Sequence, residues 1–216
     1  SPIIPNLLPM IVTVESNDAD RFLAPNQSLI YTSTVVAFSL LEPGTLTLTV
    51  PSVLGQPNPP SPYTLPFDPF TFDTAQTVTV QSKLKVIANP VSQLVNIGTI
   101  AEATALQLGG NIRVTGTYTV VVDNDKPTVQ LTSLQDGAYV KTADTTFIVI
   151  GGTAADATSY PALVRVTAQD GLNTRDATGA ASWSATVGIK PGTNTIQLSA
   201  RDAVGNQTTT LPSYTI

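Results

Sequence analysis

The feature that most constrains the fold is the alternation of apolar and polar residues along short runs rich in Val, Ile and Thr. Five such runs lie in the first half of the chain, at residues 10–16, 27–38, 44–52, 76–88 and 111–122. Successive side chains of a strand point to opposite faces, so a period of two is typical of half-buried antiparallel sheet. Helical periodicity is almost absent. The pattern therefore predicts an all-β fold.

One segment, residues 98–110 with the sequence GTIAEATALQLGG, can be interpreted as a helix or as a strand. Its apolar residues Ile100, Ala103 and Leu106 recur at helical spacing. However, Ile100, Glu102 and Thr104 alternate with three alanines, and a Gly-Gly pair suited to a hairpin turn follows. We favour the strand.

Beyond Pro127 the apolar runs become short and regularly spaced. The segments TTFIVIGGTA, ALVRVTAQDG, SWSATVGI, NTIQLSARD and QTTTLPSYTI follow the run at Val129 and Leu131, with Gly, Asp or Pro-Gly between them. Six or seven short strands in about 90 residues are typical of an immunoglobulin-like sandwich. Trp183 alternates in phase with Ala185 and Val187, which predicts a core position for this side chain.

A proline-rich insertion, at about residues 51–73, interrupts the strands of the first half. Seven of the chain's 17 prolines lie in residues 51–69, and proline cannot donate to a sheet ladder, so a long loop or a crossing between sheets is expected. Two interpretations of its aromatic residues remain open. They close one end of the first sandwich, or they bind a carbohydrate or protein by stacking, in which case the candidate ligand-binding residues are Tyr63, Phe67, Phe70 and Phe72.

The composition argues against catalysis. The chain has no cysteine and no histidine, so thiolate zinc clusters, cysteine nucleophiles and the commonest proton shuttle are all missing. Paired carboxylates remain available for catalysis, but no spacing selects a pair. We expect the protein not to be an enzyme.

Charge and hydropathy limit the partners. The net charge of −5 lies wholly in residues 1–125, and no basic stripe exists for phosphate contacts, so we expect no nucleic-acid partner. No apolar run is long enough for membrane insertion within this segment. The sequence begins at Ser1 without an initiator Met, which suggests a processed product or an excised segment.

The run VVVDNDKPTVQL joins the two halves and raises the question of a metal site. Asp123, Asn124 and Asp125 can donate oxygens to calcium, with Asp156 or Asp202 approaching from the adjoining domain. The alternative, which we favour, is a connecting segment that binds nothing. The expectation is therefore no cofactor, with calcium at the interdomain linker as the alternative.

Two further chemical hypotheses have plainer alternatives. The loop ESNDAD, with Glu15, Asp18 and Asp20, is either a second oxygen-rich site or a solvated turn, and we favour the turn. An isopeptide crosslink can also form from a strand lysine, and the candidates are Lys83, Lys85 and Lys141. Strand lysines are usually exposed charges that discourage edge-to-edge aggregation.

Three runs of the second half resemble a known family of protein modules. DNDKPTVQLTSLQDGAYV, GGTAAD and ASWSATVGIKPGTNTIQLSARDAVGNQT resemble the bacterial immunoglobulin-like (fibronectin III-like) modules that repeat in large secreted and cell-surface proteins. The resemblance covers residues 123–216. Residues 1–122, with LAPNQSLIYTSTV and LEPGTLTLTVPS, resemble a related class of bacterial surface repeats more faintly and depart from it in the proline-rich insertion.

These observations predict two tandem immunoglobulin-like antiparallel β-sandwiches, residues 1–122 and 128–216, joined by a linker at 123–127. The resemblance implies a non-catalytic, extracellular or cell-surface module with a structural, spacer or adhesion role in a larger bacterial protein. Its partners are then the neighbouring domains of the same polypeptide, and a surface glycan or protein. The alternative is a ligand-binding accessory domain of a secreted enzyme.

Overall fold

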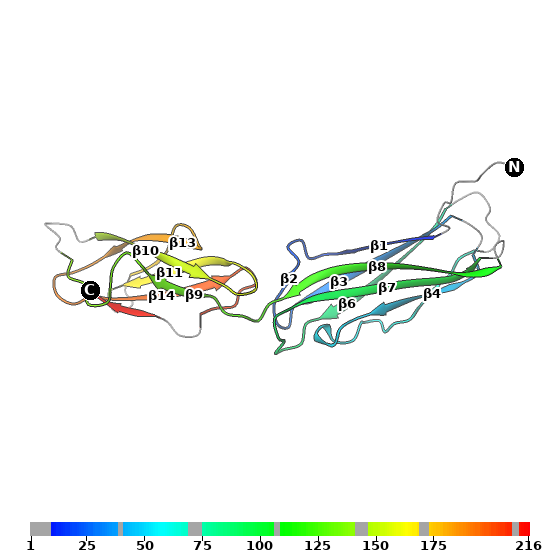
Figure 1. The fold of residues 1–216 in the computed structure, drawn as a ribbon, viewed down its shortest axis with the longest axis horizontal. Helices are drawn as coiled ribbons and strands as arrows, with labels where there is room; N and C mark the ends of the chain where they lie inside the picture. Colours follow the sequence, from blue (N-terminus) through cyan, green and yellow to red (C-terminus); the bar gives the residue numbers. More distant parts are fainter. Residues whose placement is uncertain are drawn as a thin grey trace. The chain divides into compact units, whose positions relative to one another are not determined.

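The computed structural model describes residues 10–38, 41–68, 75–105, 109–140, 147–168, 173–208 and 212–216 (Figure 1). The chain divides into two compact units, Ser1–Val122 and Asp123–Ile216. Apart from one turn of 3-10 helix, the regular structure in these ranges consists of β-strands. The predicted all-β fold is confirmed.

Unit 1 contains two sheets that enclose its core. The first has the order β1-β3-β6, and all its pairs are antiparallel. The second has the order β2-β8-β7-β4-β5, antiparallel except for a short parallel pair between β2 and β8. The strands are β1 (Met10–Ser16), β2 (Phe22–Leu23), β3 (Ser28–Ala37), β4 (Gly44–Thr49), β5 (Tyr63–Leu65), β6 (Gln76–Lys85), β7 (Gln93–Ala105) and β8 (Gly110–Val122).

The strand that we favour for the segment at 98–110 is confirmed over residues 98–105. These residues belong to β7, which pairs with β8 over 13 residues of each strand. Ala101, Ala103 and Ala105 are buried, in the alternation that the sequence predicts. Gly109 has a φ of 65° at the hairpin, a backbone conformation that glycine adopts without strain.

The core of unit 1 contains a buried polar cluster among apolar side chains. The hydroxyl of Tyr31 on β3 is hydrogen-bonded to that of Thr99 on β7, and the Ser33 hydroxyl lies 3.3 Å from Thr99 Oγ1. The Tyr31 ring meets Tyr118 edge-on, with ring centroids 6.1 Å apart. The contacts across the interior therefore include hydrogen bonds as well as apolar packing.

The proline-rich insertion crosses from one sheet of unit 1 to the other. It leaves β4, forms the 3-10 turn η1 (Ser52–Leu54), adds the short strand β5 to the edge of β4, and then reaches β6. Val53 and Leu54 are buried in the core, which anchors the start of the crossing. Of the two arrangements that the sequence allows, a long loop or a crossing between sheets, the structure has the crossing, and it adds the strand β5, which was not predicted.

Unit 2 also has two antiparallel sheets, with the orders β13-β10-β9 and β12-β11-β14-β15. Its strands are β9 (Thr128–Leu131), β10 (Phe147–Ala155), β11 (Pro161–Ala168), β12 (Asn173–Asp176), β13 (Ser182–Gly188), β14 (Thr195–Asp202) and β15 (Ser213–Thr215). Aligned apolar side chains from both sheets form its core. The strand β12 was not expected from the sequence.

Trp183 lies in the core of unit 2, as predicted, with 3 % of its surface exposed. Its ring packs against the backbone of Gly152 on the neighbouring strand β10. Ile196, Leu198 and Ala200 of β14 are buried on the opposite sheet. The two sheets therefore pack through the inward positions that the alternation indicates.

Candidate functional site

Three aspartates of unit 2 come together although they are distant in the sequence. Asp123 follows the last residue of β8, Asp156 follows β10, and Asp202 is the last residue of β14. One carboxylate oxygen of each lies within 4.8 Å of the others. We call this group the carboxylate cluster.

The carboxylate of Asp202 is held by the turn that follows it. Its Oδ1 accepts the backbone N–H groups of Val204, Gly205 and Asn206 at 3.0, 2.7 and 2.8 Å. Its Oδ2 accepts the Asn206 side-chain amide at 2.8 Å. A carboxylate two residues before a turn commonly caps N–H groups in this way, and here the capping fixes its orientation.

Asp156 is oriented by the loop between β10 and β11. Its Oδ1 accepts the N–H groups of Thr158 and Ser159 at 2.9 and 2.8 Å. Its Oδ2 is buried and has no hydrogen-bond partner. One oxygen of this carboxylate is thus used for loop structure and the other is free.

Asp123 is fully buried, with 0 % of its surface exposed. Its Oδ1 accepts the N–H of Asp125 at 2.9 Å, and its Oδ2 has no hydrogen-bond partner. Burial raises the pKa of Asp123 above its ordinary value, and the charges of Asp156 and Asp202 raise it further. The Ser159 hydroxyl and the N–H of Asp125 lower this pKa and offset part of the increase.

Of the residues that the sequence proposed for a metal, the structure places Asp123 in the carboxylate cluster. Asp156 and Asp202, which the sequence analysis gave as alternatives, both belong to the carboxylate cluster. Asp125 is half-buried, and its Oδ2 accepts the hydroxyl of Thr158 instead. Asn124 is half-buried and is not one of the three clustered residues.

The predicted linker, residues 123–127, is hydrogen-bonded into unit 2. The Asn206 side chain donates to the Asp123 carbonyl at 3.3 Å, and the Thr208 hydroxyl donates to the Pro127 carbonyl at 3.1 Å. Asp123 is also the first residue of the compact unit 2. The segment is therefore part of that unit's structure.

The aromatic residues proposed for ligand stacking divide into two groups. Phe67 is 2 % exposed in the core, and Tyr63 is half-buried with its hydroxyl 2.7 Å from the Pro59 carbonyl and 2.8 Å from Ser82 Oγ. Phe67 therefore offers no exposed stacking surface, whereas Tyr63 is partly exposed. Phe70 and Phe72 lie outside the described residues, so ligand binding by these four residues stays a prediction.

The lysines proposed for an isopeptide crosslink occupy solvent-facing positions where they are described. Lys83 and Lys85 are exposed on β6, at the edge of the first sheet of unit 1. A crosslink of this type needs a buried lysine, so these two side chains fit the alternative of exposed edge charges. Lys141 lies outside the described residues.

The loop with Asp18 and Asp20 is not a simple solvated turn. Asp18 Oδ2 is buried without a hydrogen-bond partner, and the Asp18 N–H donates to Ser16 Oγ at 3.0 Å. Burial raises the pKa of Asp18 to about 6, and the charge of Asp20 contributes to the increase. The folded chain therefore binds this proton more tightly than the unfolded chain.

This shift predicts a pH dependence of the stability of unit 1. The free energy of unfolding falls as the pH rises from the ordinary value of 3.8 to about 6, because the unfolded state ionises first, and it levels off above that range. Replacing Asp18 by asparagine removes this fall, and we expect a gain on the order of 1 kcal/mol at pH 7 after allowance for solvent screening. Denaturation across this pH range measures it, with exposed Glu15→Gln as the control. A carboxyl carbon resonance of Asp18 that titrates near pH 4 would contradict the prediction.

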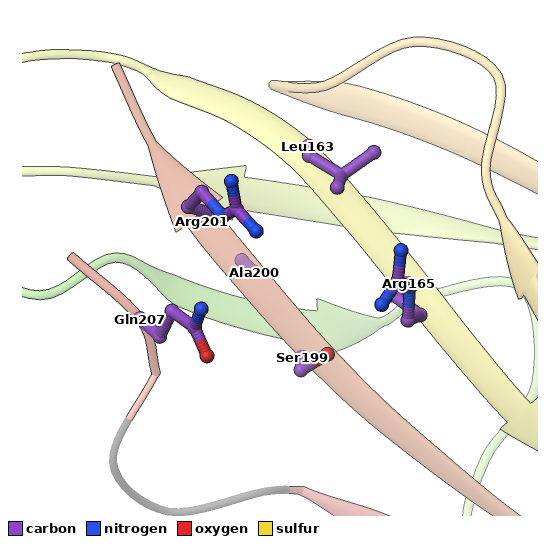
Figure 2. A pocket seen from close by; sticks show the side chains of 6 residues that line it. All are labelled: Leu163, Arg165, Ser199, Ala200, Arg201 and Gln207. Carbon is purple, nitrogen blue, oxygen red and sulfur yellow. The ribbon is translucent and has the colours of Figure 1, made fainter. Parts of the chain in front are cut away.

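Two pockets lie among the described residues of unit 2, and both are small. One has a volume of about 40 Å³ and lies over β11 and β14, where Figure 2 shows Arg165 and Arg201 with Leu163, Ser199, Ala200 and Gln207 around it. Another, of about 250 Å³, is lined by Val149, Arg175, Asp176, Thr178, Ser184, Ala185 and Thr186. Small-molecule sites usually occupy about 300–1,000 Å³, so neither pocket has the size of a typical ligand site.

Across the described ranges, no helix has the length and apolar character needed to span a membrane. No family model matches the chain, and no curated protein matches it.

Solved structures of two other proteins align weakly with the chain over most of its length. Fibronectin(III)-like modules of Clostridium thermocellum CbhA are 18 % identical with a TM-score of 0.40, and the alignment covers 95 % of this chain and 93 % of that one. The E. coli chaperone DraB is 8 % identical with a TM-score of 0.26, and the alignment covers 94 % and 98 % of the two chains. Both likenesses are weak, and neither carries an argument about function.

Proposed function

We propose that the protein is a non-catalytic structural module of a larger extracellular bacterial protein, which spaces the domains on either side of it. The observation that carries this proposal is the direct passage from unit 1 to unit 2. Val122 is paired with Gln93 in the sheet of unit 1, and the next residue, Asp123, is fully buried and hydrogen-bonded in unit 2. No free residue separates the two.

The physical basis of a spacer is the restriction of rotation at such a junction. A flexible linker gains reach and orientational freedom with each added residue. Here Val122 is paired within unit 1, Asp123 is hydrogen-bonded within unit 2, and each unit has a core of its own. The proposed function is therefore to restrict the rotation of one unit against the other.

The composition supports an extracellular setting. The charged fraction of 12 % is about half of the usual value for globular proteins, and Thr, Val and Ser are abundant, as in secreted bacterial β-proteins. We propose that its partners are neighbouring domains of the same polypeptide. Adhesion to a surface glycan or protein is the further role that this setting permits.

The test is a flexible Gly-Ser insertion between Val122 and Asp123. We expect the insertion to shorten the rotational correlation time obtained from ¹⁵N relaxation, because it allows each unit to tumble separately. The control places the same insertion between Gly109 and Gly110, where a Cβ would meet no heavy atom within 4 Å. Equal correlation times for the wild type and the junction variant would refute the spacer proposal.

A further inference from the structure

The carboxylate cluster contains two buried oxygens with no partner. Asp123 Oδ2 and Asp156 Oδ2 accept no hydrogen bond, and Asp123 is fully buried. Each of the three carboxylates is nevertheless held in place by backbone N–H groups of its own loop. The free oxygens are therefore positioned by the fold.

This arrangement is unfavourable without a positive charge. A buried carboxylate without a partner loses its hydration, and three carboxylates within 4.8 Å repel one another. The salt bridges among the described residues are Arg113–Glu102 and Arg165–Asp176, and neither involves the cluster. The negative charge of the cluster is therefore compensated either by a proton or by a bound cation.

We propose that Asp123, Asp156 and Asp202 bind a calcium ion. The donors are all oxygen atoms, which hard divalent cations prefer, and calcium accepts several carboxylates in irregular geometry. Nitrogen and sulfur donors from His and Cys are missing from the whole sequence, which disfavours zinc and other transition metals. Water and backbone carbonyls complete the six to eight ligands that calcium takes.

The ion would join three segments of unit 2. Asp123 is the first residue of the unit, Asp156 lies in the loop between β10 and β11, and Asp202 ends β14 at the start of the following turn. Because the unfolded chain does not hold these carboxylates together, calcium stabilises the folded unit by mass action. This inference does not depend on the spacer proposal, and either can fail alone.

The experiment uses the whole chain, with calcium or with a chelator. Trp183 is the only tryptophan and lies in the core of unit 2, so its fluorescence reports the unfolding of that unit. When free calcium is ten times its Kd, we expect the unfolding equilibrium constant of unit 2 to fall by about tenfold. Calorimetric titration should give one calcium per chain.

The variants separate a metal ligand from a structural side chain. Asp123→Asn and Asp156→Asn should abolish the calcium response. In chelator, Asp123→Asn should be at least as stable as the wild type, because it removes a buried charge and keeps the shape of the side chain. The control, Asp176→Asn, removes an exposed carboxylate of unit 2 and should keep the full response.

Three results would overturn the proposal. The first is an absence of binding heat together with equal midpoints in calcium and chelator, which would mean that the cluster shares a proton. The second is a calcium response that persists in both Asp123→Asn and Asp156→Asn. The third is a response to magnesium and not to calcium.

Discussion

Replacing Gly152 by alanine is expected to destabilise unit 2 by about 3 kcal/mol or more. A Cβ at this position would lie 2.0 Å from the Gln130 carbonyl oxygen and 2.7 Å from the Trp183 ring. The carbonyl belongs to the ladder of β9 with β10, and the ring is buried, so neither can move without breaking other contacts. The glycine is required for close approach of three strands.

Denaturation followed by Trp183 fluorescence measures this loss, because the probe lies beside the substitution. Gly110→Ala is the control in unit 1, where its Cβ would meet no heavy atom within 4 Å. It should leave the Trp183 transition, and with it the free energy of unfolding of unit 2, unchanged. A Gly152→Ala variant as stable as this control would show that the sheet is more adaptable than the structure indicates.

Replacing Tyr31 by alanine is expected to destabilise unit 1 by about 4 kcal/mol. The side chain is fully buried between the two sheets of the unit, where it contacts Tyr118 and reaches Thr99 with its hydroxyl. Its removal creates a cavity and breaks a buried hydrogen bond. Both losses are on the same unit, so the stability of unit 2 should not change.

Tyr31→Phe separates the two contributions. It keeps the ring and removes the hydroxyl, while Thr99 keeps Ser33 as a neighbour at 3.3 Å, so we expect a loss of about 1 kcal/mol. Hydrogen exchange of the β3 amides measures unit 1, and Trp183 fluorescence monitors unit 2. Equal losses in the phenylalanine and alanine variants would mean that the hydrogen bond, and not packing, dominates this part of the core.

Sequence patterning predicts the strands with long alternation. In β7, the alanines at 101, 103 and 105 alternate with Glu102 and Thr104, and the same alternation appears in the burial. The strands β5 and β12 have three and four residues and were missed. Such short strands exist because a neighbouring strand offers an edge, which is a tertiary effect that local patterning does not record.

The candidate site was predictable only in part. The acidic run at 123–125 indicates oxygen donors, and Asp123 is one of the three clustered residues. The other two lie 33 and 79 positions further along the chain, at strand ends that the folded topology brings together. Asp125 accepts the Thr158 hydroxyl instead, and no spacing rule in the sequence indicates that partner.

The short parallel pair of β2 with β8 has a mechanical consequence. Val121 and Val122 are paired on one side with β7 and on the other with β2, and the Val121 N–H donates to the Arg21 carbonyl at 2.8 Å. Tension applied at Asp123 therefore enters a strand that is held along both edges up to its last residue. The load is shared at once between two ladders, and the end of unit 1 cannot peel away one hydrogen bond at a time from a single neighbour.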